Sequence, residues 1–193
     1  MEPFDDRLNN AVVGVAGLGG LGSMVAAALV RTGIGRLILC DFDRVEASNL
    51  NRQHYFRDQI GRPKVEATVE NLLRIDPEAR LEPHNLRLDP ASVRSTFGRA
   101  HVVAECLDRA DQKQMLAETV LADLPGAVLV TVSGIAGFGL SNEILTRRLS
   151  DRVILVGDGR RDAAPGDPLT AGRVWIAAAH QANAIVEVLM TLL

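Results

Sequence analysis

The sequence contains little cysteine and little lysine. Its 193 residues include two cysteines, Cys40 and Cys106, which are too few for a disulfide framework or a four-ligand zinc site. No Cys-x-x-Cys pair is present and the four histidines are scattered, so we expect no structural zinc. This cysteine usage favours a protein of the reducing cytosol. Lys64 and Lys113 are the only lysines, which draws attention to both positions.

The chain also lacks a large charge excess and an uninterrupted apolar span. Its net charge is −3 with both signs interspersed, so neither nucleic acid nor an anionic membrane is the expected partner. Residues 8–30 carry no charge, which raises a membrane helix as an alternative, but five glycines interrupt them. The opening MEPFDD is acidic, whereas a signal peptide begins with basic residues. We therefore expect a cytoplasmic protein without a membrane span.

Apolar strands alternate with helical segments along the chain. Buried strands are predicted at 11–17, 36–40, 101–107, 127–134 and 152–158, with an extended segment, suited to a sheet edge, at 79–88. Helices are predicted at 21–33, 64–75, 111–124 and 174–193. The length suits one domain covering 1–193. The alternation predicts a doubly wound, mostly parallel, Rossmann-like α/β sheet with helices on both faces, whose ligands bind beyond the carboxyl ends of the strands.

A glycine-rich segment, GLGGLG, lies between the first predicted strand and the first predicted helix. It matches the dinucleotide-binding fingerprint in the required context. Gly17 would allow the tight turn, Gly19 and its neighbour Gly20 would let phosphate approach the backbone, and Gly22 would let the helix pack closely. The helix N-terminus would offer N–H groups to an anion. A tight turn without ligand is the alternative, and the loop does not distinguish NAD, FAD and ATP.

The second predicted strand is followed by the polar segment DFDRVEASNLNRQ, residues 41–53. Asp41 lies about 20 residues beyond the glycine loop, where a carboxylate can accept ribose hydroxyls. A dehydrogenase would share both features. We expect the aromatic residues Tyr55 and Phe56 to pack beneath the nucleotide loop.

Further polar residues exceed what a dehydrogenase needs. Asn49, Arg52 and Gln53 lie close together, and Lys64 follows in GRPK. Arginine offers a fork of donors that suits phosphate oxygens, and lysine offers a compact charge. Together these side chains would surround a triphosphate.

A carboxylate is predicted at the same rim. Asp108 follows the predicted strand 101–107. Magnesium is typically held by one or two carboxylates together with substrate phosphates. Asp108 is therefore the expected magnesium ligand, and Asp43 is a second candidate.

The segments GLGGLGS, DFDRVEASNLNRQ, GRPK and ECLDRADQK together resemble the nucleotide site of the ThiF/MoeB family, relatives of the ubiquitin-activating enzymes. The resemblance covers residues 11–124 in the family's order of motifs. It implies Mg-ATP-dependent adenylation of the C-terminal glycine of a small ubiquitin-like sulfur carrier, usually by a homodimer. The residues implied are Asp41 for ribose, Asn49, Arg52, Gln53 and Lys64 for the phosphates, and Asp108 for magnesium.

The implied chemistry is attack of a carboxylate on the α-phosphate of ATP, with pyrophosphate leaving. Positioning and charge neutralisation supply the rate of such a step, so Arg52, Lys64 and Asp108 are the expected catalytic residues. In homodimeric relatives an arginine of the partner's N-terminal segment reaches the phosphates. Arg7 is a candidate for that role, and a solvated surface arginine is the alternative.

The chain departs from larger relatives in having no cysteine that matches their catalytic cysteine. Cys40 and Cys106 each end a predicted buried strand, where cysteine is usually a small hydrophobic residue. Adenylation without a thioester stage is therefore expected, with sulfur supplied by another protein. The short length favours the compact ThiF-like branch linked to thiamine biosynthesis.

Other interpretations stay open. The glycine loop would also serve an NAD- or FAD-dependent oxidoreductase, or a nucleotide-binding scaffold without catalysis. A related family member could activate a small-molecule or tRNA carboxylate. Segment 133–142, SGIAGFGLSN, suits either the path of a Gly-Gly tail or an ordinary loop, and 157–173 is expected to be a surface loop.

Overall fold

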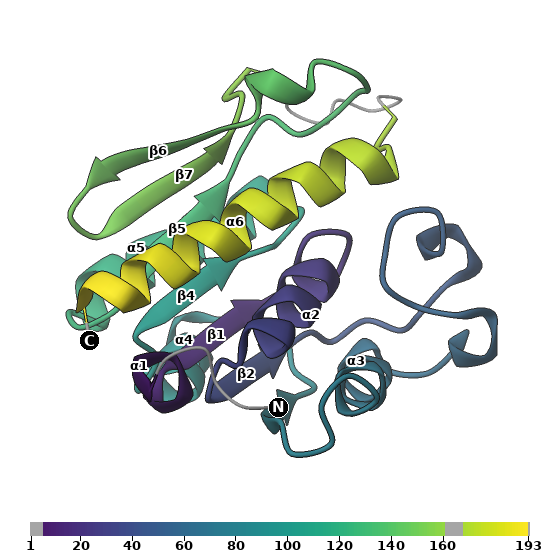
Figure 1. Ribbon diagram of the computed structural model, residues 1–193, viewed down its shortest axis with the longest axis horizontal. Helices are drawn as coiled ribbons and strands as arrows, with labels where there is room; N and C mark the ends of the chain where they lie inside the picture. The colour runs from purple at the N-terminus through teal and green to yellow at the C-terminus, as the bar shows by residue number, and fades with distance from the viewer. Residues whose placement is uncertain (1–5, 161–167, 193) are drawn as a thin grey trace.

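The computed structural model describes residues 6–160 and 168–192. Within them, seven strands form one sheet in the order β3-β2-β1-β4-β5-β7-β6 (Figure 1). All neighbouring pairs are parallel except β6 with β7, which is antiparallel. The predicted doubly wound, mostly parallel sheet is thus confirmed. The strands are β1 (Val12–Ala16), β2 (Arg36–Cys40), β3 (Arg80–His84), β4 (Val102–Glu105), β5 (Val128–Val132), β6 (Leu145–Ser150) and β7 (Val153–Gly157).

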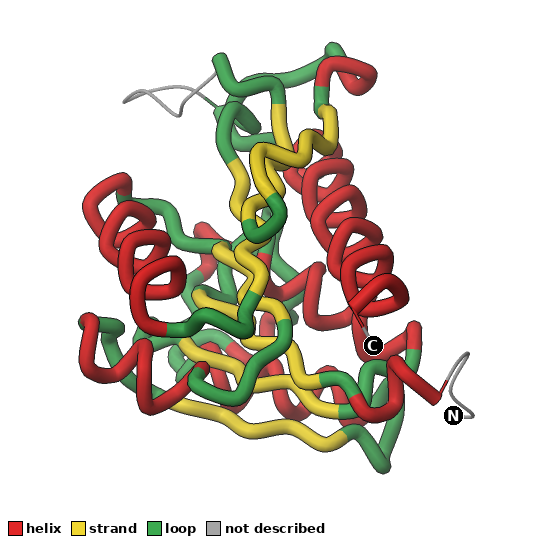
Figure 2. Tube along the Cα trace, turned by 90° about the vertical axis from the view of Figure 1, so that its left-hand side faces the viewer, coloured by secondary structure: helices red, strands yellow, loops and turns green. Residues whose placement is uncertain are grey.

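Helices cover both faces of the sheet (Figure 2). One apolar cluster joins the sheet to α1 (Asp6–Asn10), α2 (Gly22–Thr32), α3 (Lys64–Leu73) and α6 (Ala171–Leu192). The other cluster joins the opposite face to α4 (Pro90–Phe97) and α5 (Ala110–Asp123). No helix in the described part of the chain is long and apolar enough to cross a membrane.

The central strand β1 shows why its sequence is apolar throughout. Val13 and Val15 pack into the cluster on the α2 and α6 face, whereas Ala16 packs into the cluster on the α4 and α5 face. Side chains alternate between the faces of a strand, and both faces of a parallel sheet are covered by helices. The continuous apolar character of this segment therefore indicated both that it is a strand and that helices cover both of its faces.

Two α-helices and one strand of the described chain were not predicted. Helix α1 precedes the first strand, and α4 begins after Asp89, whose side chain accepts a hydrogen bond from the Ser92 backbone N–H at 2.7 Å. Strand β6 is exposed at every residue, so it lacks the apolar pattern of the buried strands. Helix α6 begins at Ala171, within the predicted loop 157–173. Residues 161–167 of that loop lie outside the described residues.

The order of the strands indicates where a ligand would bind, at the carboxyl ends of the central strands. From β1 the chain proceeds outward to β2 and β3, and then returns to β4 on the other side of β1. The carboxyl ends of β1 and β4 therefore lie at a topological switch point, where open α/β sheets bind their ligands.

Candidate functional site

A cavity of about 860 Å³ opens at the carboxyl ends of β1, β2, β4 and β5. Its volume is in the range of small-molecule binding sites. Of the predicted site residues, those that line it are Gly17, Gly19, Gly20, Asp41, Asp43, Arg52, Gln53, Lys64 and Asp108. Gly22 and Asn49 are not among its lining residues. Motifs that are distant in the sequence thus meet in one cavity.

The glycine turn forms the part of the cavity that follows β1. Gly17 has a φ of +91°, a conformation that side chains rarely adopt. A Cβ atom at Gly17 would lie 2.7 Å from the carbonyl oxygen of Cys106. The turn therefore requires glycine for its conformation and for the close approach of the backbone after β4.

Gly22 supports the turn from behind. A Cβ atom at this position would lie 1.8 Å from the Gly17 carbonyl oxygen, so only glycine lets α2 begin against the turn. Among the described residues no side chain caps the start of α2, and the N–H groups of Ser23 and Val25 donate instead to the carbonyls of Gly19 and Leu21, at 3.1 and 2.9 Å. This is the packing role predicted for Gly22.

Asp41 fixes the glycine turn. Its Oδ2 accepts a hydrogen bond of 2.7 Å from the Leu18 N–H, and its Oδ1 accepts one of 2.8 Å from the Asp43 N–H. Burial raises the pKa of Asp41, while the charge of Lys64 and the two N–H donors act in the opposite direction. The carboxylate keeps unused acceptor capacity, so a contact to ribose is compatible with this arrangement and stays a prediction.

Lys64 is the first residue of α3 and is buried. Its Nζ donates to Asp43 Oδ2 at 2.9 Å and lies 4.0 Å from Asp41 Oδ2. A cation at a helix N-terminus is unfavourable, because that end of the helix dipole is positive. Burying a charge is also costly unless it is paired. Such a local conflict is typical of a position retained for function.

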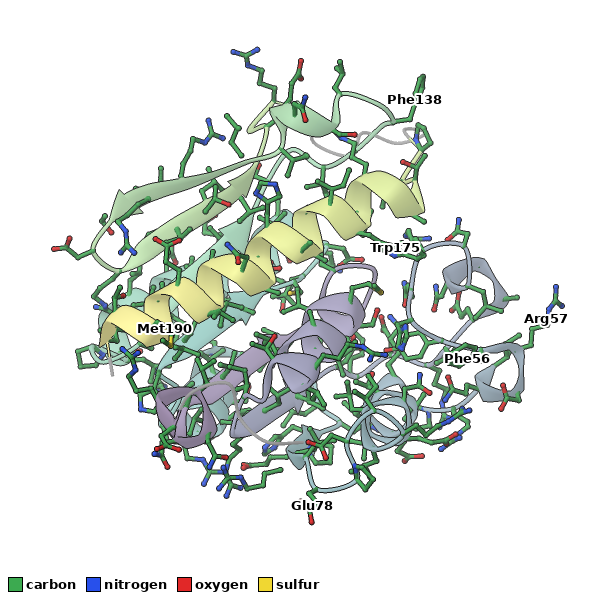
Figure 3. The ribbon with its side chains drawn as sticks, viewed as in Figure 1. Phe56, Arg57, Glu78, Phe138, Trp175 and Met190 are labelled. Carbon is green, nitrogen blue, oxygen red and sulfur yellow. The ribbon has the colours of Figure 1, made fainter. Side chains whose placement is uncertain are left out.

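Arg52 and Gln53 come from the segment after β2. The Arg52 guanidinium donates to Asn51 Oδ1 at 2.8 Å, and the Arg52 carbonyl accepts from the Trp175 indole N–H at 2.9 Å. Figure 3 shows Trp175 on α6 facing this segment. Among the described residues, the buried Gln53 Oε1 has no hydrogen-bond partner, which typically costs about 1–3 kcal/mol. A ligand or water in the cavity would satisfy it.

Asn49 and the two aromatic residues complete this segment. Asn49 Oδ1 accepts a hydrogen bond of 3.0 Å from the Glu46 N–H, so its side chain shapes the loop, and its phosphate contact stays a prediction. Tyr55 is buried and donates to the Leu18 carbonyl at 2.7 Å, which confirms its packing beneath the loop. The prediction for Phe56 was wrong, because 48% of it is exposed.

Asp108 lies on the loop between β4 and α5, at the cavity wall. No cluster of three or more His, Cys, Asp or Glu side chains able to hold a metal occurs among residues 6–160 and 168–192. Magnesium needs only one or two carboxylates when phosphates supply other ligands. Asp108, with Asp43 in the same cavity, therefore fits a magnesium ion that arrives with a nucleotide.

Sequence reasoning missed an aromatic and apolar wall of the cavity. Phe42 and Arg87 line the cavity with Leu86 and Leu88, and the Arg87 guanidinium carbon lies 5.7 Å from the centroid of the Phe42 ring. Apolar and aromatic side chains with a few polar groups are typical of ligand sites. Phe42 lies within the quoted segment DFDRVEASNLNRQ, whereas nothing in the sequence singled out Arg87.

The sequence also failed to identify an ion pair at the cavity wall, formed by Lys113, which lines the cavity, and Glu105 behind it. Glu105 is completely buried and accepts a hydrogen bond of 2.6 Å from Lys113 Nζ. Two signals were available: one charged residue within the apolar segment HVVAECL, and one of only two lysines.

Arg7 lies away from the cavity of its own chain. Its Nη1 donates to the Met190 carbonyl at 2.7 Å, near the end of α6. Cations near a helix C-terminus are stabilised by its unpaired carbonyls. The predicted reach of Arg7 into a partner's site stays a prediction.

The loop after β5 also contributes to the cavity, through Ser133, Gly134 and Ile135. Buried Arg173 holds the loop by donating to the carbonyls of Gly139 and Leu140, at 2.9 and 3.1 Å. The loop is thus organised next to the proposed nucleotide site. A path for a Gly-Gly tail along it stays a prediction.

Both cysteines line the cavity and are buried. Burial, and then the charge of Asp41, raise the pKa of Cys40 to about 12. Burial is also the main cause that raises the pKa of Cys106, followed by the charge of Glu105. Since the thiolate is the nucleophilic form, neither residue suits thioester formation near neutral pH.

We therefore expect iodoacetamide at pH 7.5 to leave both cysteines of the folded protein unmodified. The comparison is the same protein in denaturant, which should be alkylated at both positions under the same conditions. Peptide mass spectrometry reads each site separately. Rapid modification of Cys40 or Cys106 in the folded protein would contradict their assignment as buried, unreactive thiols.

The family of the chain follows from comparison with known proteins. A family model described as "ThiF family" matches residues 1–140. The chain belongs to the ThiF family.

Curated relatives carry the name ubiquitin-like modifier-activating enzyme 5. The protein from Caenorhabditis elegans is 38% identical over 114 residues, which are 53% of this chain and 27% of that protein. The protein from Drosophila virilis is 45% identical over 83 residues, 43% of this chain and 21% of that protein. The matched part is about a quarter of the length of these relatives.

Solved structures share the fold at lower sequence identity. The E. coli tRNA N6-threonylcarbamoyladenosine dehydratase TcdA, in complex with ATP, gives a TM-score of 0.87 at 24% identity, covering 96% of this chain and 88% of that chain. E. coli MccB with ATP gives a TM-score of 0.75 at 22% identity, covering 97% and 58%. These likenesses support the Rossmann-like fold.

Proposed function

We propose that residues 1–193 form one adenylyltransferase domain that uses ATP and magnesium to activate the C-terminal glycine of a small ubiquitin-like protein. One observation carries the proposal: the glycine turn, Arg52, Lys64 and Asp108 line one cavity at the switch point of the sheet. The names of the curated relatives support a ubiquitin-like partner.

The residues of the cavity suit phosphate chemistry. Its lining includes five cationic side chains and three carboxylates, so the balance of charge favours an anion. Lys64 and Arg52 would neutralise charge that develops on the phosphates as the substrate carboxylate attacks and pyrophosphate leaves. Asp41 would hold the ribose and the glycine turn, and backbone N–H groups of that turn, which lines the cavity, would face phosphate. Magnesium, held by Asp108, would supply further charge neutralisation.

At a finer level, we propose that the partner is a sulfur carrier of thiamine biosynthesis and that the protein adenylates it as a cytoplasmic homodimer. The resemblance of the four motifs supports this assignment. The buried thiols of Cys40 and Cys106 support adenylation without a thioester stage on this chain. Sulfur would then come from another protein.

A second candidate is activation of a non-protein carboxylate. It is favoured by the TcdA structure, whose name specifies a modified tRNA nucleoside and of which this chain covers 88%. In that case the same nucleotide cavity would serve a different acceptor.

Mass spectrometry of candidate carriers separates these two functions. Carriers ending in Gly-Gly are incubated with the protein, ATP and magnesium, and we expect a mass gain of one adenylyl group. The control is the same carrier without its terminal glycine, which should gain nothing. If no carrier is adenylated, but the protein consumes ATP when a tRNA with a carboxylate-bearing nucleoside is added, the second candidate replaces the first.

A further inference from the structure

A buried carboxylate lies directly beneath the loop that bears Asp108. Glu105 ends β4 and is completely buried. Its Oε2 accepts hydrogen bonds from Lys113 Nζ at 2.6 Å and from Thr131 Oγ1 at 2.7 Å. Its Oε1 accepts one from the Leu107 N–H at 2.7 Å. Three elements, β4, β5 and α5, thus converge on one side chain.

This network fixes both backbone polar groups of Leu107. Glu105 accepts from its N–H, and Lys113 Nζ donates to its carbonyl at 3.3 Å. That carbonyl belongs to the peptide that joins Leu107 to Asp108. The position from which the Asp108 side chain leaves the backbone is therefore set by Glu105, behind the cavity wall, and by Lys113, which lines the cavity.

The electrostatic cost of the network suggests that it serves more than stability. Replacing a buried ion pair by apolar residues of similar volume is often neutral or stabilising. Glu105 nonetheless lies in the otherwise apolar strand β4, and its partner Lys113 comes from the polar first turns of α5, with 26% of its side chain exposed. Metal ligands generally depend on outer hydrogen-bonding groups that orient them, and losing one such group typically costs 10–100-fold in metal affinity.

We infer that Glu105, Lys113 and Thr131 are positioning residues, which hold Asp108 in the orientation needed to bind magnesium beside ATP. The inference rests on the proposed function, because it takes Asp108 as the metal ligand. Thr131 is the most informative member, since it does not line the cavity and can act on a bound metal only through Glu105.

The test measures binding of Mn²⁺ to the protein–ATP complex by electron paramagnetic resonance, with ATP affinity in EDTA measured separately. We expect Glu105→Gln and Lys113→Met to weaken Mn²⁺ binding about tenfold or more. Thr131→Val should weaken it several-fold, and Lys113→Arg should restore most of it. Metal-free ATP affinity should stay unchanged in Thr131→Val, because this variant alters no group of the cavity.

Thr119→Val is the matched control. Thr119 is a buried hydroxyl on α5 that donates to the Met115 carbonyl at 2.8 Å, away from Glu105, and its loss should leave Mn²⁺ binding unchanged. Circular dichroism confirms folding. If Glu105→Gln does not fold, Thr131→Val and Lys113→Met decide the result.

Asp108→Ala distinguishes failure of the inference from failure of the proposed function. If Asp108→Ala weakens Mn²⁺ binding but the three positioning variants bind Mn²⁺ like the wild type, the inference is wrong and the metal ligand stands. If Asp108→Ala also binds Mn²⁺ normally, Asp108 is not the ligand, and the inference falls together with that part of the proposed function.

Discussion

Lys64→Ala will reduce carrier-dependent exchange of pyrophosphate into ATP by about 10²–10³-fold or more, the effect of removing one donor from a developing charge. Its ammonium group is buried in the cavity, where two aspartates hold it. In a site of low dielectric constant from which water is excluded, the interaction of such a charge with the phosphates is stronger than in water. The fold should survive, because Asp41 and Asp43 would remain near the N-terminus of α3, where negative charge is favourable. We expect a loss of the same order for Arg52→Ala.

The measurement is incorporation of labelled pyrophosphate into ATP, with circular dichroism to confirm folding. Arg57→Ala is the matched control, because Arg57 comes from the same polar region and points away from the protein (Figure 3). It should retain full activity. Full activity in both Lys64→Ala and Arg52→Ala would refute the assignment of the cavity.

Gly22→Ala will destabilise the protein by about 3 kcal/mol, at the upper end of the cost of overpacking. Its new methyl group would lie 1.8 Å from the Gly17 carbonyl oxygen. The obstacle is backbone, so α2 or the glycine turn would have to move. Denaturant unfolding measures the change, and ATP affinity should fall with it because the turn lines the cavity in which we propose that ATP binds.

Gly172→Ala is a control for which we expect the opposite change in stability. Gly172 lies near the start of α6, and a Cβ atom there would have no atom of residues 6–160 or 168–192 within 4 Å. Alanine at such a helical position should increase stability by up to about 1 kcal/mol. A Gly22→Ala protein as stable as the wild type would contradict the close packing of α2 on the turn.

The buried strands and the nucleotide motifs were predictable because each depends on local sequence. Strands such as Val12–Ala16 are apolar throughout because helices cover both faces, and the glycine turn has a fixed spacing. The rule that ligands bind at the carboxyl ends of the strands then predicted the rim at which Asp41 and Asp108 lie, and the same cavity includes Lys64, although Lys64 and Asp108 are 44 positions apart in the sequence.

The elements that were missed depend on context or on signals that were not used. Within the described part of the chain, strand β6 pairs only with β7 at the edge of the sheet, and it is exposed throughout, so no apolar pattern indicates it. Helix α4 had a usable signal, Asp89 followed by Pro90 and Ser92, which form its cap. The partners of Glu105 come from α5 and β5, and no spacing in the sequence reveals their meeting.

Calorimetric titration of the protein with ATP and with NAD⁺, each in the presence of magnesium, tests the central claim most directly. The site predicts saturable binding of ATP that is lost in Lys64→Ala, and no measurable binding of NAD⁺. Tight binding of NAD⁺ without binding of ATP would contradict the account and favour an oxidoreductase.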